Sequence, residues 1–288
     1  MKDEKEFYIG YMPNAPKSFS SRNKVVVIFI LVLIPIVTFL LVSGQKGFPN
    51  SQFEFGNLVE LEGVLFKEPI PILKVKTGED AFGKDIYQSI MLINFLKYGA
   101  DELLKGYEEK ISNPLNQTKV KVKGTLIYYN GVTLLELTDQ ENALIDYGPI
   151  DGPALSQTNN VLGNAELSGE IVDPKCFFGV MKPGEGKPHK SCAIRCIAGG
   201  IPPVLMVKND QGHANYIILK GANGEYINQQ ILPYVANPIK LSGNLMKVDD
   251  WLVMETSEDQ WVSLPDNSST DDFYTDHQHD GMASICIR

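Results

Sequence analysis

Hydrophobic and polar residues follow two patterns along the chain: one long apolar run near the N-terminus, and short stretches of alternation beyond it. Residues 25–43 (VVVIFILVLIPIVTFLLVS) are nineteen consecutive residues without a charge, close to the roughly 20 that a helix needs to cross a hydrocarbon core. We therefore expect a transmembrane helix over this range. A cleaved signal peptide is the alternative, but the polar residues 1–24 ahead of the run argue against it.

The basic residues beside this run predict its orientation. Lys17, Arg22 and Lys24 precede it, whereas only Lys46 follows closely. By the positive-inside rule, residues 1–24 lie in the cytoplasm and the rest of the chain lies outside. We therefore expect a single-pass membrane anchor that carries the bulk of the protein.

Beyond a link rich in Gly, Pro, Asn and Ser, period-two alternation predicts a first β domain over residues 52–147. Its expected elements are the strands 58–66, 70–75 and 90–95, the helix 99–112, and the strands 119–128 and 132–137. Asn130 and Gly131, between the last two strands, are the strongest short hairpin signal. Three strands, a helix and two strands is the order of an oligonucleotide/oligosaccharide-binding (OB) type of barrel.

A second domain is expected at residues 165–262, after a linker at 148–164 that is rich in Gly, Pro, Ser and Asn. Its elements repeat the order of the first domain: strands 165–172, 204–207 and 216–219, a helical piece at 227–235, and strands 239–246 and 252–256. We predict a mainly β chain with two tandem OB-like five-stranded barrels, followed by a tail at 263–288. The second barrel carries about thirty extra residues between its first two strands.

The net charge and the lack of known catalytic motifs limit the classes of function that the sequence allows. The formal net charge is −9, and residues 44–288 carry 21 Lys and Arg against 32 Asp and Glu. Such an acidic surface repels phosphate backbones, so we expect no nucleic-acid partner. The sequence has no nucleophile elbow, phosphate-binding loop or HExxH segment. We therefore expect no catalytic and no cofactor-binding residues, and we interpret Glu170 and Asp173 as surface or loop residues.

The candidate chemistry lies in the extra residues of the second domain. They contain three of the four cysteines, Cys176, Cys192 and Cys196, and one of the four histidines, His189. A helix over 190–198 places Cys192 and Cys196 one above the other, with His189 on the same side. Cys176 can approach across the intervening loop. Three cysteines and a histidine form a tetrahedral Zn²⁺ site, and soft thiolates suit Cu(I) equally, so zinc or copper is the expected metal.

Two other states of these cysteines remain open. An exported chain normally pairs its cysteines, and the fourth one, Cys286, allows two disulfide bonds. Alternatively, Cys192 and Cys196 form a reactive dithiol, because basic residues crowd around the sulfurs in an otherwise acidic chain and favour thiolates. These basic residues are Lys175, Lys182, Lys187, Lys190 and Arg195.

The tail contains a second, weaker group of soft ligands. His277, His279 and Met282 lie close to Cys286 in the sequence. Histidines in a polar tail are more often solvated than metal-bound. If the tail folds back onto the inserted segment, Cys286 completes a metal site or a second disulfide.

The segments GEIVDPKC and CAIRC, with His189 between them and Gly199-Gly200 after them, are similar to those of a family of small exported bacterial domains of unknown function. The resemblance covers residues 167–256, and the loop between Cys176 and His189 is longer here than in that family. It implies a β-barrel domain with a cysteine and histidine cluster in a bacterial envelope compartment.

These features together predict a non-enzymatic, membrane-anchored protein of the bacterial inner membrane whose bulk lies in the periplasm. We expect it to be an accessory subunit of a respiratory or other redox membrane complex, with other subunits as partners, or a metal-handling protein. A thiol-disulfide oxidoreductase is the first alternative. A structural or ligand-binding module stapled by disulfides is the second.

Overall fold

The computed structural model describes residues 17–44, 51–138, 142–150, 154–209 and 213–265. The chain divides into two units, Met1–Pro49 and Asn50–Arg288. The described residues are mainly β, as the sequence predicts. The second soft-ligand group lies outside the described residues, and it consists of His277, His279, Met282 and Cys286.

The first unit contains the helix α1 (Lys17–Gly44), which has Pro35 inside it. Its segment Ser20–Ser43 has a mean hydropathy of 3.4 and is long and apolar enough to cross a membrane, by length and composition. A membrane anchor and a signal sequence both have these properties. The predicted apolar helix is therefore confirmed, while its orientation stays a prediction.

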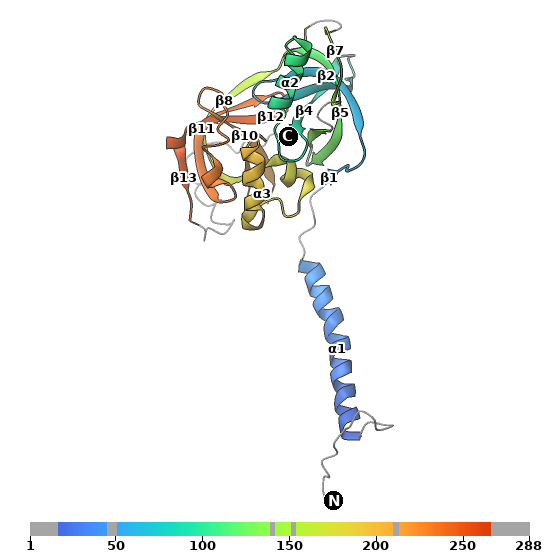
Figure 1. The fold of residues 1–288 in the computed structure, drawn as a ribbon. Helices are drawn as coiled ribbons and strands as arrows, with labels where there is room; N and C mark the ends of the chain where they lie inside the picture. The colour runs from blue at the N-terminus through green and yellow to red at the C-terminus, as the bar shows by residue number, and fades with distance from the viewer. Residues whose placement is uncertain (1–16, 45–50, 139–141, 151–153, 210–212, 266–288) are drawn as a thin grey trace, which may run out of the picture. The chain divides into compact units, whose positions relative to one another are not determined.

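The second unit contains two closed five-stranded barrels (Figure 1). The first is built from β2 (Val59–Phe66), β3 (Ile72–Glu79), β4 (Asp85–Asn94), α2 (Asp101–Ile111), β5 (Thr118–Tyr129) and β6 (Val132–Leu137). The strands pair in the order β2-β3-β4-β6-β5, and β5 closes onto β2. All these pairings are antiparallel except that of β4 with β6, which is parallel. The predicted hairpin at Asn130-Gly131 is present, and both residues have positive φ.

The second barrel repeats this topology. It is built from β8 (Asn159–Val172), β9 (Val204–Lys208), β10 (Ala214–Gly221), β11 (Pro238–Val248) and β12 (Trp251–Thr256). The order is β8-β9-β10-β12-β11, β11 closes onto β8, and β10 pairs with β12 in parallel. Short strands extend the two sheets, and they are β1 (Ser51–Phe53), β7 (Leu144–Gly148) and β13 (Trp261–Ser263).

The fourth strand of each barrel contains one glycine, in VKVKGTLIYY and in IKLSGNLM, at a place where two strands approach closely. A Cβ on Gly124 would lie 2.5 Å from the Glu136 carbonyl oxygen, and a Cβ on Gly243 would lie 2.3 Å from the Glu255 carbonyl oxygen. Only glycine permits strands to approach this closely where a small barrel coils. The repeat therefore reflects the same packing requirement in both barrels.

The structure differs from the sequence prediction at three places in the second barrel. β8 begins at Asn159, inside the predicted linker 148–164, because its exposed first residues pair with β11 although they do not alternate. The helical piece expected at 227–235 is reduced to the 3-10 helix η2 (Leu232–Tyr234). A further 3-10 helix, η3 (Glu258–Gln260), precedes β13.

The extra residues between β8 and β9 form the π-helix η1 (Cys176–Val180) and the helix α3 (Gly186–Ala198). Both elements lie between the first two strands of the second barrel. η1 packs against β1 and β5 of the first barrel. The insertion therefore fills the junction between the two barrels.

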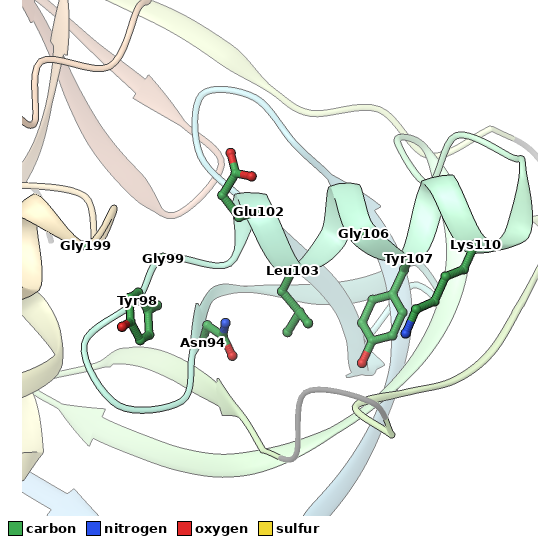
Figure 2. Close-up of a pocket in the computed structure, with 9 residues that line it drawn as sticks. All are labelled: Asn94, Tyr98, Gly99, Glu102, Leu103, Gly106, Tyr107, Lys110 and Gly199. Carbon is green, nitrogen blue, oxygen red and sulfur yellow. The ribbon is translucent and has the colours of Figure 1, made fainter.

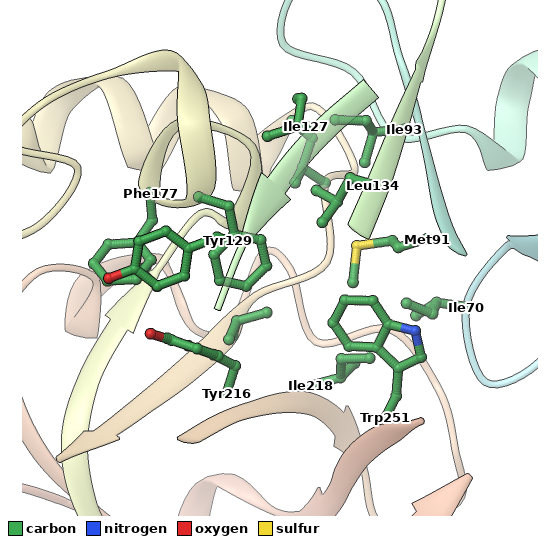
Figure 3. Packing of buried hydrophobic residues seen from close by; sticks show 14 of the residues in the cluster. Ile70, Met91, Ile93, Ile127, Tyr129, Leu134, Phe177, Tyr216, Ile218 and Trp251 are labelled. Carbon is green, nitrogen blue, oxygen red and sulfur yellow. The ribbon is translucent and has the colours of Figure 1, made fainter. Parts of the chain in front are cut away.

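The two barrels share one hydrophobic cluster. Figure 3 shows Trp251 of the second barrel beside Met91 and Ile70 of the first, while Tyr129 lies among Phe177 and Tyr216. The Trp251 indole N–H donates to the Ser89 carbonyl at 3.0 Å, across the junction. Because this apolar surface is buried only when the barrels meet, burial holds them together.

Candidate metal centre

The helix α3 carries two of the three clustered cysteines, and its sequence explains its limits. Pro188 lies in the first turn, where a missing N–H costs no intrahelical hydrogen bond. Gly200 follows the helix with φ of 97°, a conformation that glycine adopts readily. The helix therefore begins four residues before the predicted position, at Gly186, and includes His189.

The structure brings together the sulfurs of Cys176, Cys192 and Cys196. All three Sγ atoms lie within 4.8 Å of one another. The Cys176 and Cys192 sulfurs are 3.9 Å apart, and all three cysteines are free thiols. Cys176 and Cys196 are buried, whereas Cys192 is partly exposed. This cysteine cluster has the donor atoms to bind a metal ion.

His189 belongs to a second group of ligand atoms, which shares Cys176 with the first. Its partners are Cys176 and Asp173, and the ligand atoms of the three lie within 4.8 Å of one another. The His189 Nε2 atom is 3.0 Å from Asp173 Oδ2, and the Cys176 N–H donates to Asp173 Oδ1 at 2.9 Å. Asp173 lies in the connection between β8 and η1, as a loop residue, but its side chain is fully buried, so the interpretation of it as a surface residue is wrong.

Glu170, the other residue interpreted as surface or loop, lies in the strand β8 and is partly buried, and its carboxylate has a specific role. It accepts a hydrogen bond from the N–H of Gly186, the first residue of α3. A carboxylate at a helix N-terminus satisfies an unpaired N–H and interacts favourably with the helix dipole. Glu170 therefore fixes the start of the helix that carries the cysteines.

The cation beside the sulfurs is Lys97, which the sequence does not single out. Lys97 lies between β4 and α2 in the first barrel, and its Nζ atom is 2.7 Å from Cys192 Sγ and 3.8 Å from Cys196 Sγ. Its ammonium donates to Cys192, which raises the pKa of Lys97. The contact joins residues 95 positions apart, so no local pattern could indicate it.

Most of the basic residues expected at the sulfurs bind elsewhere. Lys175 is buried and pairs with Glu136 at 2.6 Å, while it also donates to the carbonyls of Asn94 and Leu96. Lys182 donates to the Phe177 carbonyl, and Lys190 donates to Asn237. Lys175 therefore holds the inserted segment to the first barrel.

A hydrogen bond between Cys176 and Cys196 shifts the pKa values of the two thiols in opposite directions. The hydrogen bond to Cys196, burial and the Asp173 carboxylate raise the pKa of Cys176. The same hydrogen bond, together with the nearby Lys97 ammonium, lowers the pKa of Cys196 although burial opposes it. The cluster therefore favours a thiolate at Cys196 that accepts the Cys176 S–H.

Close backbone packing positions Lys97. The Gly99 N–H donates to the Gly199 carbonyl at 3.0 Å, and a Cβ on Gly199 would lie 2.0 Å from the Lys97 carbonyl oxygen. Beside this contact lies a surface cavity of about 460 Å³ (Figure 2). Its lining residues are Asn94, Tyr98, Gly99, Glu102, Leu103, Gly106, Tyr107, Lys110 and Gly199.

Comparisons with known protein families, with curated proteins and with solved structures find no match. The resemblance based on residues 167–256 therefore stays a prediction. What the chain has, by its own structure, is an apolar helix, two OB-like barrels and a cysteine cluster at their junction.

Proposed function

We propose that the protein is a membrane-anchored metal-handling protein that holds a soft ion at Cys176, Cys192 and Cys196. The observation that carries this proposal is the grouping of three sulfurs within 4.8 Å, supplied by two separate elements of the inserted segment. Because folding already holds these thiols close together, metal binding loses little further conformational entropy in ordering the ligands.

The distance between two sulfurs supports the same function. Thiolates bound to one ion at about 2.3 Å lie about 3.8 Å apart in a tetrahedral site and about 4.0 Å apart in a trigonal one. The Cys176 and Cys192 sulfurs are 3.9 Å apart. An ion could therefore bind with little movement of this pair.

Charge favours the same chemistry. Thiolates, and not thiols, bind metals, and a nearby ammonium stabilises a thiolate. Lys97 supplies that ammonium 3.8 Å from Cys196, and the hydrogen bond from Cys176 and this ammonium both lower the pKa of Cys196. Thiolates select Cu(I) or Zn²⁺ over hard cations such as Mg²⁺ and Ca²⁺. The class of ion is therefore Cu(I) or Zn²⁺.

The wider setting of this function is the periplasmic side of a bacterial inner membrane, as an accessory subunit of a redox complex. The apolar helix α1 supports the membrane anchor, and the excess of acidic residues beyond it argues against nucleic acid as a partner. Co-purification from native membranes, followed by identification of the bound subunits, tests the assignment to a complex.

Metal analysis of the full-length protein tests the metal site. The protein is purified in detergent without a histidine tag, under reducing and anaerobic conditions, and is offered Zn²⁺ or Cu(I) separately. We expect stoichiometric binding in the wild type and its loss in Cys176→Ser, Cys192→Ser and Cys196→Ser. Cys286→Ser is the matched control and should retain the metal. Absence of stoichiometric metal in the wild type would overturn the proposal.

A thiol-disulfide oxidoreductase is the second candidate, favoured by the Lys97 contact at the partly exposed Cys192. In that function, Cys176 and Cys192 form a disulfide while two electrons and two protons pass to a disulfide of a partner protein, which becomes a dithiol. Fast alkylation of Cys192 near neutral pH, and a Cys176–Cys192 bond after oxidation, would support it. Slow alkylation of Cys192, comparable to that of an unfolded chain, would exclude it.

A further inference from the structure

We propose a second metal position at Asp173, Cys176 and His189, with the Cys176 thiolate bridging it to the three-cysteine position. This inference rests on the proposed metal function and adds a second ion to the same site. It predicts a centre of two ions per chain, one held by sulfur alone and the other by nitrogen, oxygen and sulfur.

The three residues form a built and enclosed ligand set. Asp173, Cys176 and His189 are 0%, 4% and 3% exposed, and their ligand atoms lie within 4.8 Å of one another. The His189 Nε2 and Asp173 Oδ2 atoms are 3.0 Å apart. A nitrogen and an oxygen bound to one tetrahedral ion at about 2.0 Å lie about 3.3 Å apart, so an ion requires this pair to open by only a few tenths of an ångström.

The structure separates the two ligand groups. His189 does not join the three sulfurs in one group of mutually close ligand atoms, and only Cys176 belongs to both groups. A single ion bound by all three cysteines and by His189 would therefore require the imidazole or a sulfur to move. Two ions that share the Cys176 sulfur require no such movement, because each binds to one of the two existing groups of ligand atoms.

Backbone contacts direct Asp173 toward this position. Its Oδ1 atom accepts the Cys176 N–H at 2.9 Å, which leaves Oδ2 facing the His189 ring. His189 is itself held on α3, one turn before Cys192. A backbone hydrogen bond thus fixes Asp173 and the helix α3 fixes His189, as a preorganised metal position requires.

Charge balance indicates a divalent ion. Within the described part of the chain, no lysine or arginine contacts the buried Asp173 carboxylate. A buried carboxylate without a positive partner is costly, and a neutral, metal-binding His189 does not supply that partner. The Asp173 carboxylate and the three cysteine thiolates together carry four negative charges, which neutralise two divalent ions, and His, Asp and Cys are all ligands of Zn²⁺. The class of ion at this position is therefore Zn²⁺, with an open fourth coordination site.

The test is the number of ions bound by the full-length protein. Reduced wild type without a histidine tag is titrated with Co²⁺ as a spectroscopic probe for Zn²⁺, and bound Zn²⁺ is measured separately by elemental analysis. We expect two ions per chain, with thiolate-to-cobalt absorption that continues to rise during the second equivalent. A wild type that saturates at one ion would overturn the second position, whatever the variants do.

The variants assign the second ion to these residues. Asp173→Asn and His189→Ala should each bind one ion, and Cys176→Ser should lose the bridged pair. His213→Ala and Asp146→Asn change an exposed histidine and an exposed aspartate, and both should bind two ions. Two ions in His189→Ala and in Asp173→Asn would also overturn the proposal.

Two further outcomes separate this inference from its alternatives. The triple variant His277→Ala, His279→Ala and Cys286→Ser should still bind two ions, and a fall to one would place the second ion in the tail. If the wild type binds one ion that depends on the three cysteines but not on His189, the second position fails and the proposed function stands. If the wild type binds none, both fail.

Discussion

The Lys97 ammonium nitrogen lies 2.7 Å from the Cys192 sulfur, although Lys97 belongs to the first barrel and Cys192 to the insertion in the second. The state of the cysteine cluster therefore depends on how the two barrels are joined. The backbones at Lys97 and Gly199 also meet at this junction, and they pack too closely for a side chain at Gly199.

Lys97→Met removes the ammonium while it keeps most of the side-chain length. Because a partly exposed ion pair contributes about 0.2–1 kcal/mol, we expect Cys192 to react with iodoacetamide about 1.4- to fivefold more slowly near neutral pH. Mass mapping of the labelled peptide after timed quenching measures the rate at each cysteine.

Lys105→Met is the matched control for Lys97→Met, because Lys105 is exposed on α2. It should alkylate at the wild-type rate. An unchanged rate in Lys97→Met would show that the Lys97 contact does not influence the thiol, and the oxidoreductase function would lose its main support.

Gly199→Ala and Gly106→Ala should have opposite effects on stability. A Cβ at Gly199 meets the Lys97 carbonyl at 2.0 Å, whereas a Cβ at Gly106, inside α2, meets nothing within 4 Å. We expect Gly199→Ala to lower the free energy of unfolding by about 1–3 kcal/mol. Gly106→Ala should raise it by about 0.5–1 kcal/mol, because alanine is the better helix former.

Urea unfolding of both variants, followed by circular dichroism, measures this difference. Cysteine labelling of folded Gly199→Ala should also change at Cys192, because the loop that carries Lys97 has to move. If Gly199→Ala is as stable as Gly106→Ala, the close contact between the loop and the end of α3 is not present in solution.

Local pattern predicts the barrels because each strand carries its own signal. The residues of β5 alternate between more and less buried positions along most of the strand, so period-two alternation finds it. The first residues of β8 are exposed and do not alternate, so only their backbone pairing with β11 defines them. The repeated order of strands predicted the second barrel, even where the boundary of an individual strand was wrong.

The candidate site was predicted only where its residues are close in sequence. Cys192 and Cys196 lie four apart on one helix, so helical geometry alone brings their sulfurs together. Lys97 reaches them through the junction of two barrels, and nothing near it in the sequence indicates this. The burial of Asp173 was not predicted, because it results from the packing of η1 and α3 and a polar residue gives no local sign of it.

Lys175→Met should strongly destabilise the junction of the barrels. Its ammonium is 2.6 Å from the Glu136 carboxylate, and both side chains are at least nine-tenths buried. Removing one partner leaves an uncompensated buried charge, which costs about 3–5 kcal/mol. Chemical denaturation of the single variant measures this loss.

The double variant Lys175→Met with Glu136→Leu separates charge from packing. Replacement of a buried ion pair by apolar residues is often nearly neutral, so we expect the double variant to recover most of the stability lost in Lys175→Met. A double variant as unstable as the single one would mean that the Lys175 hydrogen bonds to the Asn94 and Leu96 carbonyls, and not the ion pair, hold the segment.

Glu170→Gln should remove part of the pH dependence of stability. Burial raises the pKa of Glu170 above 4.5, although the Gly186 N–H opposes the shift. Because the folded state holds this proton more tightly than the unfolded state, its contribution to stability is complete below pH 4.5 and is lost as pH rises through the folded pKa. The free energy of unfolding of wild type, relative to Glu170→Gln, should therefore fall between about pH 4.5 and neutrality. Urea titrations across this range measure the difference, with Glu109→Gln as an exposed control that follows wild type. Parallel curves for wild type and Glu170→Gln would mean that Glu170 is solvated, and that its carboxylate does not fix the start of α3.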